Sequence, residues 1–243
     1  MELLESHFNN LNGNLLYNVN TNTYEMFATS TNPGGGGGGG YIHKHINYLT
    51  FKKLFEQMNG MKNPHILESG IASAGINSTY LFNEYVRKYG GFFWSVDINP
   101  NLVNQHQGNM CPATQLICDD SVSFFKKWSK SHDVVNVIYL DSYDLDFYDP
   151  TPSANHGLAE YKSLMPVIKK DTLLLIDDTP INPYWLDSRS KLYHDMTSYY
   201  IDNKNTMPGK GMLVLNEITN ANMLLHNYQV LYKFYDSPID VNP

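Results

Sequence analysis

Five short apolar segments, each ending in or followed by carboxylate side chains, constrain the fold of this chain most strongly. Continuous apolar segments of this length are typical of strands that helices bury on both faces, as in parallel α/β sheets. Asp is a common turn residue, but acids after all five segments are not expected by chance. Because ligands of such sheets bind beyond the carboxyl ends of the strands, we expect these acids to share one cleft. The segments are residues 66–69, 92–97, 114–118, 134–140 and 172–176.

A loop of small residues follows the first segment and leads into a helix start. Gly70 and Gly75 allow positive φ angles and close approach of the backbone. Asn77, Ser78 and Thr79 offer side-chain oxygens that can cap the following helix. The pattern predicts a nucleotide-sized pocket at the mouth of the strand, although a two-glycine loop equally suits a tight strand-to-helix turn.

Asp97 ends the second segment, at the place where Rossmann-like folds put the acid that binds a ribose. We therefore predict that Asp97 is a ribose ligand. The alternative is a structural role, in which Asp97 caps the turn that Asn99 and Pro100 begin.

The order of these residues resembles that of class I S-adenosylmethionine-dependent methyltransferases. It is most similar to the metal-dependent O-methyltransferases, which include the catechol type and the macrocin type that modifies sugars. The resemblance extends from about Tyr41 to Phe234. It implies a Rossmann-like α/β fold, with a seven-stranded, mostly parallel sheet, helices on both faces and a C-terminal antiparallel hairpin. The residues that carry it are Glu68 and Gly70, Asp97, Asp120 and Ser121, Asp141, and the pair Asp177 and Asp178.

The resemblance also assigns a cofactor, S-adenosylmethionine, to the strand ends. Asp97 would bind the ribose hydroxyls, and Asp120 with Ser121 would bind the adenine. The methionine part would lie against the first strand end and its loop, through Glu68, Ser69, Gly70, Ser73, Gly75 and Ser78.

A divalent cation is the second group that the resemblance implies, held by Asp141, Asp177 and Asp178. Three carboxylates in one cleft repel one another unless a cation or a basic group compensates their charge. No Lys or Arg lies within the two acidic strand ends themselves. Because oxygen-only ligands suit Mg²⁺ or Mn²⁺ better than Zn²⁺, we predict magnesium or manganese.

The general base is left open by the sequence. Sugar-modifying relatives often carry a second acid two residues after the first metal aspartate, and this chain has Tyr143 there. The candidates are Asp141, Asp144 and His156. His156 lies in a capped helix start, so its alternative role is that of an ordinary histidine on a helix face.

The remaining segments are assigned more coarsely. We expect a helix within residues 41–60, a strand at 212–215, a helical segment at 221–226 and a strand at 228–234. The loop-rich stretch 179–211 is crowded with tyrosines that suit either a substrate wall or a helix packed on the sheet.

The first forty residues differ in character from the rest. Residues 34–40 are seven consecutive glycines, a composition typical of a flexible linker. We therefore divide the chain into an N-terminal arm (1–33), a polyglycine linker (34–40) and a methyltransferase domain (41–243). The arm could cover the cofactor, pack on a partner subunit in a homo-oligomer, or be a remnant of a larger polypeptide.

Composition excludes several classes of protein. The net charge is −7, so no basic nucleic-acid footprint is expected, and no apolar run is long enough to span a membrane. Two cysteines are too few for a disulfide framework, and the start lacks a signal-peptide layout. These features predict a cytoplasmic enzyme.

The predicted reaction is direct transfer of the cofactor's methyl group to a hydroxyl of a sugar, glycan or other small molecule. One rival is a nicotinamide-dependent oxidoreductase, which has a similar first strand and ribose acid. The chain lacks the Gly-x-Gly-x-x-Gly loop and the Tyr-x-x-x-Lys helix expected of it. The other rival is a catalytically silent methyltransferase-like domain that binds a partner through its N-terminal arm.

Overall fold

The computed structural model of the chain describes residues 1–11, 15–18, 23–26, 41–71, 75–146, 148–185 and 191–238. The predicted linker, residues 34–40, lies outside this part of the chain, as does Ser73 of the predicted cofactor loop. The division into arm, linker and domain therefore stays a prediction.

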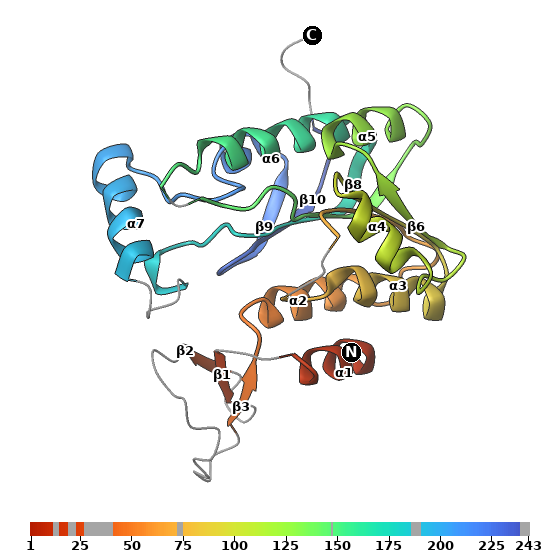
Figure 1. Cartoon of the computed structure of the whole chain (residues 1–243), viewed down its shortest axis with the longest axis horizontal. Helices are drawn as coiled ribbons and strands as arrows, with labels where there is room; N and C mark the ends of the chain where they lie inside the picture. Colours follow the sequence, from red (N-terminus) through yellow and green to blue (C-terminus); the bar gives the residue numbers. More distant parts are fainter. Residues whose placement is uncertain are drawn as a thin grey trace.

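A seven-stranded sheet forms the centre of the molecule (Figure 1). Its order is β6-β5-β4-β7-β8-β10-β9, in which the first five strands are parallel and β10 runs antiparallel to both β8 and β9. This confirms the predicted fold, including the C-terminal antiparallel hairpin. The strands are β4 (His65–Ser69), β5 (Phe92–Asp97), β6 (Thr114–Cys118), β7 (Val135–Leu140), β8 (Ile168–Ile176), β9 (Ala221–His226) and β10 (Val230–Phe234).

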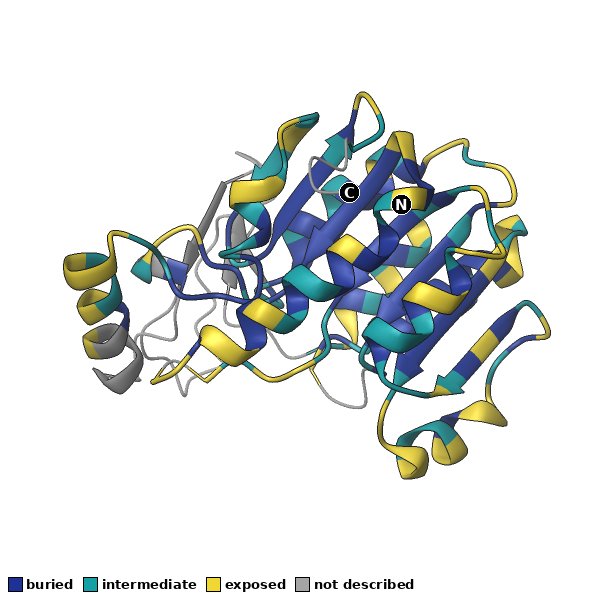
Figure 2. Cartoon of the chain, turned by 90° about the horizontal axis from the view of Figure 1, so that it is seen from above, coloured by how far each residue is buried: buried dark blue, intermediate teal, exposed yellow. Residues whose placement is uncertain are grey.

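The central strands are buried on both faces because successive side chains enter two separate cores. In β7, Val137 and Tyr139 pack on one side, and Ile138 and Leu140 pack on the other. Figure 2 shows the central strands as a buried layer. This burial explains why these segments are continuously apolar rather than alternating.

Helices cover both faces of the sheet. The first core contains side chains of α1 (Glu2–Asn9), α2 (Tyr48–Met58) and α3 (Ser78–Tyr89). The second contains side chains of α5 (Ser121–Trp128) and α6 (Thr151–Leu164). Short or peripheral helices complete the fold, namely α4 (Pro100–Gln107), α7 (Lys191–Lys204), α8 (Val214–Glu217), and the 3-10 turns Met165–Val167 and Pro183–Trp185.

Two sequence-based expectations in the C-terminal region were wrong. Residues 212–215 do not form a strand: the helical turn α8 begins at Val214, and the Leu215 N–H donates to the Gly211 carbonyl at 2.9 Å. Residues 221–226 form β9, not a helical segment, because they pair with β10 at the edge of the sheet. Long-range pairing thus overrides the local pattern at 221–226, whereas a local helical hydrogen bond forms at 212–215.

The N-terminal segment contributes directly to the domain core. Leu4 and Phe8 of α1 are fully buried against α2 and α3. The helix expected within residues 41–60 begins only at Tyr48, because the preceding residues form a strand. This strand joins a separate three-stranded antiparallel sheet of β1 (Leu15–Asn18), β2 (Thr23–Met26) and β3 (Tyr41–Lys44), in the order β2-β1-β3.

No helix in the described ranges has the length and apolarity needed to cross a membrane. Cys111 is buried, Cys118 is exposed, and both are free thiols.

Candidate functional site

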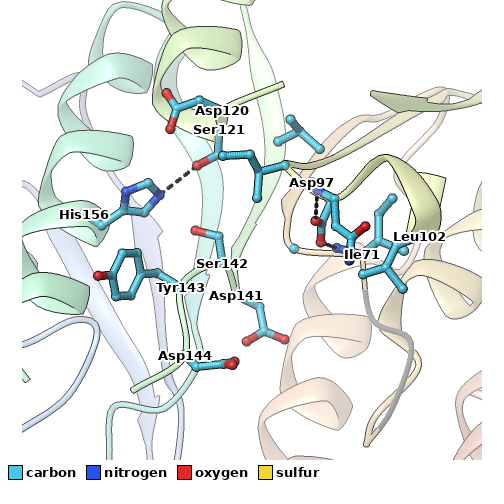
Figure 3. A pocket seen from close by; sticks show the side chains of 14 residues that line it. Ile71, Asp97, Leu102, Asp120, Ser121, Asp141, Ser142, Tyr143, Asp144 and His156 are labelled. Carbon is cyan, nitrogen blue, oxygen red and sulfur yellow. Dashed lines mark hydrogen bonds between the residues drawn. The ribbon is translucent and has the colours of Figure 1, made fainter. Parts of the chain in front are cut away.

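A cavity of about 650 Å³ lies at the carboxyl ends of β4, β5, β6 and β7. Figure 3 shows Asp97 and Leu102 on one side of it, and Tyr143 and His156 on the other. Its size falls within the range of small-molecule and cofactor sites. The lining residues are Gly70, Ile71, Val96, Asp97, Ile98, Asn99, Leu102, Asp120, Ser121, Asp141, Ser142, Tyr143, Asp144 and His156.

Gly70 lines this cavity immediately after β4. Its φ is +85°, and a Cβ atom there would lie 2.4 Å from the carbonyl oxygen of Asp141. Its N–H donates to the Val96 carbonyl at 2.8 Å. Only glycine satisfies both the backbone angle and the close approach of the β7 end, so the two central strand ends meet at this residue.

Asp97 is held at the cavity by two backbone donors. The Ile71 N–H donates to Oδ2 at 3.0 Å, and the Asn99 N–H donates to Oδ1 at 2.7 Å (Figure 3). Asn99 in turn caps α4 by accepting from the Asn101 N–H. The predicted turn-capping role is therefore present. Each carboxylate oxygen can still accept a further hydrogen bond, so the ribose role stays a prediction alongside it.

Asp120 and Ser121 line the cavity at the start of α5. Asp120 caps this helix by accepting from the Ser123 N–H at 2.8 Å. Ser121 Oγ and His156 Nε2 lie 2.9 Å apart in a hydrogen bond (Figure 3). The same His156 nitrogen lies 3.4 Å from Glu160 Oε1 on the next turn of α6, and this contact raises the pKa of His156.

Glu68 is not among the residues that line the cavity. It is fully buried, and its carboxylate accepts from the hydroxyls of Ser78, Thr79 and Ser95, each at 2.6 Å. Burial raises the pKa of Glu68 from 4.5 to about 7. These hydrogen bonds link β4 to β5 and to the start of α3. The contact of Glu68 with the cofactor stays a prediction.

The raised pKa of Glu68 makes the stability of the protein depend on pH. Because the folded state keeps the proton that the unfolded state has already lost, the stabilising contribution of Glu68 is fully present below about pH 4.5 and is lost as pH rises through about 7. Relative to Glu68→Gln, the parent's free energy of unfolding should fall by about 2.5 kcal/mol between about pH 5 and about pH 8. Urea denaturation at both pH values measures this difference, with the surface substitution Glu56→Gln as a control. Parallel pH profiles for parent and Glu68→Gln would contradict the prediction.

The three predicted metal aspartates do lie close together, but a lysine lies among them. Lys210 Nζ lies 2.8 Å from Asp141 Oδ1 and 3.0 Å from Asp178 Oδ2. Asp177 instead accepts from Tyr139 Oη at 2.6 Å and from Gln229 Nε2 at 2.9 Å. The charge repulsion expected from the sequence is therefore relieved by an ammonium group and by neutral donors.

The predicted divalent cation does not fit this arrangement. Among the described residues, no group of three or more His, Cys, Asp or Glu side chains is arranged to hold a metal ion. One carboxylate oxygen of Asp141 and one of Asp178 form ion pairs with Lys210. The observation that no Lys or Arg lies within the strand ends is correct, but the compensating basic group comes from a later segment of the chain.

The predicted site residues fall into three groups. Those that line the cavity are Gly70, Asp97, Asp120, Ser121, Asp141, Asp144 and His156. Glu68, Ser69 and Ser78 are buried and do not line it, and neither does Gly75, which is exposed. Asp177 and Asp178 do not line the cavity: Asp178 pairs with Lys210, and Asp177 accepts from Tyr139 and Gln229.

Sequence reasoning missed the partners of Asp141, Asp177, Asp178 and His156. They are Lys210, Tyr139, Tyr228, Gln229 and Glu160. Only Lys210 had a recognisable signal, because it stands between two glycines after a proline, in Pro208–Gly209–Lys210–Gly211.

The strand order, the antiparallel hairpin and the cavity at the central strand ends define the Rossmann-like fold of class I S-adenosylmethionine-dependent methyltransferases. A solved structure with this fold is the MycE methyltransferase from the mycinamycin biosynthetic pathway, in complex with Mg, SAH and mycinamycin VI. It is 13% identical with a TM-score of 0.50, and the match covers 82% of this chain and 52% of MycE.

Two further solved structures are also similar to this chain. The CurJ carbon methyltransferase is 12% identical with a TM-score of 0.47, and the match covers 77% of this chain and 54% of CurJ. A TehB-like methyltransferase from Corynebacterium glutamicum is 13% identical with a TM-score of 0.40, over 76% of this chain and 85% of its own. The chain spans about half the length of MycE and CurJ. No protein-family model and no curated protein matches the chain.

Proposed function

We propose that this protein is an S-adenosylmethionine-dependent methyltransferase that methylates a hydroxyl oxygen of a small molecule or glycan. The observation that carries the proposal is Asp97, which backbone donors hold at the end of β5 in a cavity of cofactor size. MycE, whose solved structure contains SAH, supports the same cofactor.

The cavity offers suitable surfaces for the ribose, the adenine and the charged sulfur of the cofactor. Asp97 presents acceptors for two ribose hydroxyls, and Asp120 with Ser121 presents polar atoms for an adenine. Ile98 has a relative exposure of 75% and lies with Leu102 in the cavity wall, where an aromatic base could cover both. When bound, the cofactor supplies a methyl group on a positively charged sulfur, and the acidic lining favours that charge.

Asp141 is the base that the geometry favours for the acceptor hydroxyl. It lines the cavity at the end of the central strand β7, and burial together with Asp177 raises its pKa well above the ordinary value. A carboxylate with a raised pKa is better matched to taking a proton near neutral pH. Asp144 lines the cavity as an exposed side chain, and His156 is engaged with Ser121 and Glu160, so both rank behind Asp141.

The acceptor would enter past Tyr143, which lines the cavity and has a relative exposure of 54%. Its φ is +57°, an uncommon angle for a bulky residue, and strain of this kind clusters at functional sites. Its ring lies 5.5 Å from that of His156. An exposed aromatic side chain beside carboxylates suits the apolar face and hydroxyls of a sugar, and MycE, whose structure contains mycinamycin VI, makes a natural-product acceptor a reasonable first choice.

Calorimetry tests the proposal without knowledge of the acceptor. S-adenosylhomocysteine, S-adenosylmethionine and NAD are each titrated into the protein, with and without magnesium. We expect the two sulfur compounds to bind and NAD not to bind. Binding of NAD but of neither sulfur compound would contradict the methyltransferase proposal and favour a nicotinamide-dependent oxidoreductase.

Asp97→Ala should weaken binding of S-adenosylhomocysteine by about 10- to 150-fold, because a charge-assisted hydrogen bond contributes roughly 1.5–3 kcal/mol. Asp97→Asn keeps an acceptor for the Ile71 N–H and should also bind more weakly. The control is Asp119→Ala, which removes an acid that pairs with Lys127 on the surface after the next strand. If a folded Asp97→Ala variant binds as tightly as the parent, Asp97 serves only the turn into α4.

A further inference from the structure

Lys210 is a buried cation between two strand ends. Its side chain has a relative exposure of 5%, and its ammonium group bridges Asp141 after β7 and Asp178 after β8. Side chains of lysine are almost never buried without a partner of opposite charge. Here the two partners are residues that the sequence assigned to a divalent cation.

The backbone around Lys210 is fitted closely to the rest of the fold. The Lys210 N–H donates to the Asp178 carbonyl at 3.0 Å, and the Gly211 N–H donates to Thr179 Oγ1 at 3.0 Å. A Cβ atom at Gly209 would lie 2.8 Å from the Asp178 carbonyl oxygen, and one at Gly211 would lie 2.8 Å from Thr179 Oγ1. The two glycines therefore let this segment lie directly against residues 178 and 179.

The opposite side of the segment is equally close to α6. A Cβ atom at Gly157 would lie 2.7 Å from the Lys210 carbonyl oxygen. Contacts from both sides thus fix the backbone that carries the ammonium group. The position of Lys210 is built into the fold and does not result from a long side chain folding back from the surface.

The other carboxylate oxygens near Lys210 are also occupied. Tyr228 Oη donates to Asp178 Oδ1, and Tyr139 Oη and Gln229 Nε2 donate to the two oxygens of Asp177. A divalent cation needs several oxygen ligands free to point at it, and a nearby ammonium group would repel it.

We propose that Lys210 takes the place of the divalent cation in this protein: its ammonium group bridges Asp141 and Asp178, orients Asp141 toward the cavity and makes the site independent of added metal. Lys210 is thus a positioning residue that acts through Asp141. The part of the proposal that concerns methyl transfer rests on the proposed function, whereas the replacement of the metal does not.

Uptake of Mn²⁺, followed by electron paramagnetic resonance of the free ion, tests the replacement directly. The parent and the control Lys233→Ala, which removes a surface lysine paired with Asp171, should take up no Mn²⁺ at this site. Lys210→Ala leaves the carboxylates uncompensated and should bind one Mn²⁺ at least tenfold more tightly than the parent. The gain should disappear in Lys210→Ala combined with Asp178→Asn. The thermal midpoint should rise with Mn²⁺ only in Lys210→Ala.

Two results would overturn the proposal. One is Mn²⁺ uptake by the parent that Asp178→Asn abolishes, and the other is a folded Lys210→Ala variant that binds Mn²⁺ no better than Lys233→Ala. If Lys210→Ala does not fold, Lys210→Gln removes the charge with a smaller loss of volume. If neither variant folds, Mn²⁺ uptake by the parent decides by itself. Calorimetry with S-adenosylhomocysteine on the same samples separates a failure of the methyltransferase proposal from a failure of this one.

Discussion

Lys210→Met should lower the free energy of unfolding by about 3–5 kcal/mol, the largest stability loss that we expect from a single charge removal in this protein. Methionine keeps most of the volume and removes the ammonium group that lies between Asp141 and Asp178. Burial lowers the pKa of Lys210, but Asp178 and Asp141 raise it well above its ordinary value, so the lysine is charged throughout the physiological range. Its loss leaves the partly buried carboxylates of Asp141 and Asp178 without a compensating charge.

Urea denaturation at neutral pH measures the effect. The matched control is Lys233→Met, because Lys233 forms an exposed ion pair with Asp171 at 3.0 Å, and such pairs contribute about 0–1 kcal/mol. Equal stability losses in the two variants would show that the ion pairs of Lys210 do not stabilise the fold.

Gly70→Ala should destabilise the protein by about 3 kcal/mol or more and weaken binding of S-adenosylhomocysteine. The new Cβ would lie 2.4 Å from the Asp141 carbonyl oxygen, and the φ of +85° is strained for any other residue. This clash is relieved only if the ends of β4 and β7 move apart. Because residues at both ends line the cavity, the movement would also disturb the binding site.

Gly75→Ala separates the two causes of this effect. Gly75 also has a positive φ, +66°, but a Cβ atom at this residue would have no other atom within 4 Å among the described residues. The Gly75→Ala variant should therefore show only the cost of the backbone angle, about 1–2 kcal/mol. Denaturation and calorimetry of the two variants provide the comparison, and a Gly70→Ala variant as stable as Gly75→Ala would mean that the strand ends can move apart freely.

The parallel strands and their acidic ends could be predicted from the sequence because both are encoded locally. Segments such as 92–97 and 114–118 are strands with the predicted bounds, since a short apolar run between turn residues has few other ways to be buried. Asp97, Asp120 and Asp141 then meet at one cavity because parallel strands end at the same edge of the sheet.

Edge elements and terminal segments were decided by tertiary contacts. Residues 221–226 have a helix-like local pattern, but pairing with β10 makes them a strand. The burial of Leu4 and Phe8 could not be foreseen either, because α1 finds its apolar partners on α2 and α3, far along the chain.

The acidic cluster was likewise predicted in part from the sequence and decided in part by tertiary contacts. The sequence by itself determined that Asp141, Asp177 and Asp178 would lie together and need compensation, because their positions follow from the strand ends. Only the tertiary structure decided that Lys210, Tyr139 and Gln229 provide it. The physical reason is that Coulomb interactions and hydrogen bonds depend on distance in space, and the segment that carries Lys210 reaches the acids through packing against residues 178, 179 and Gly157.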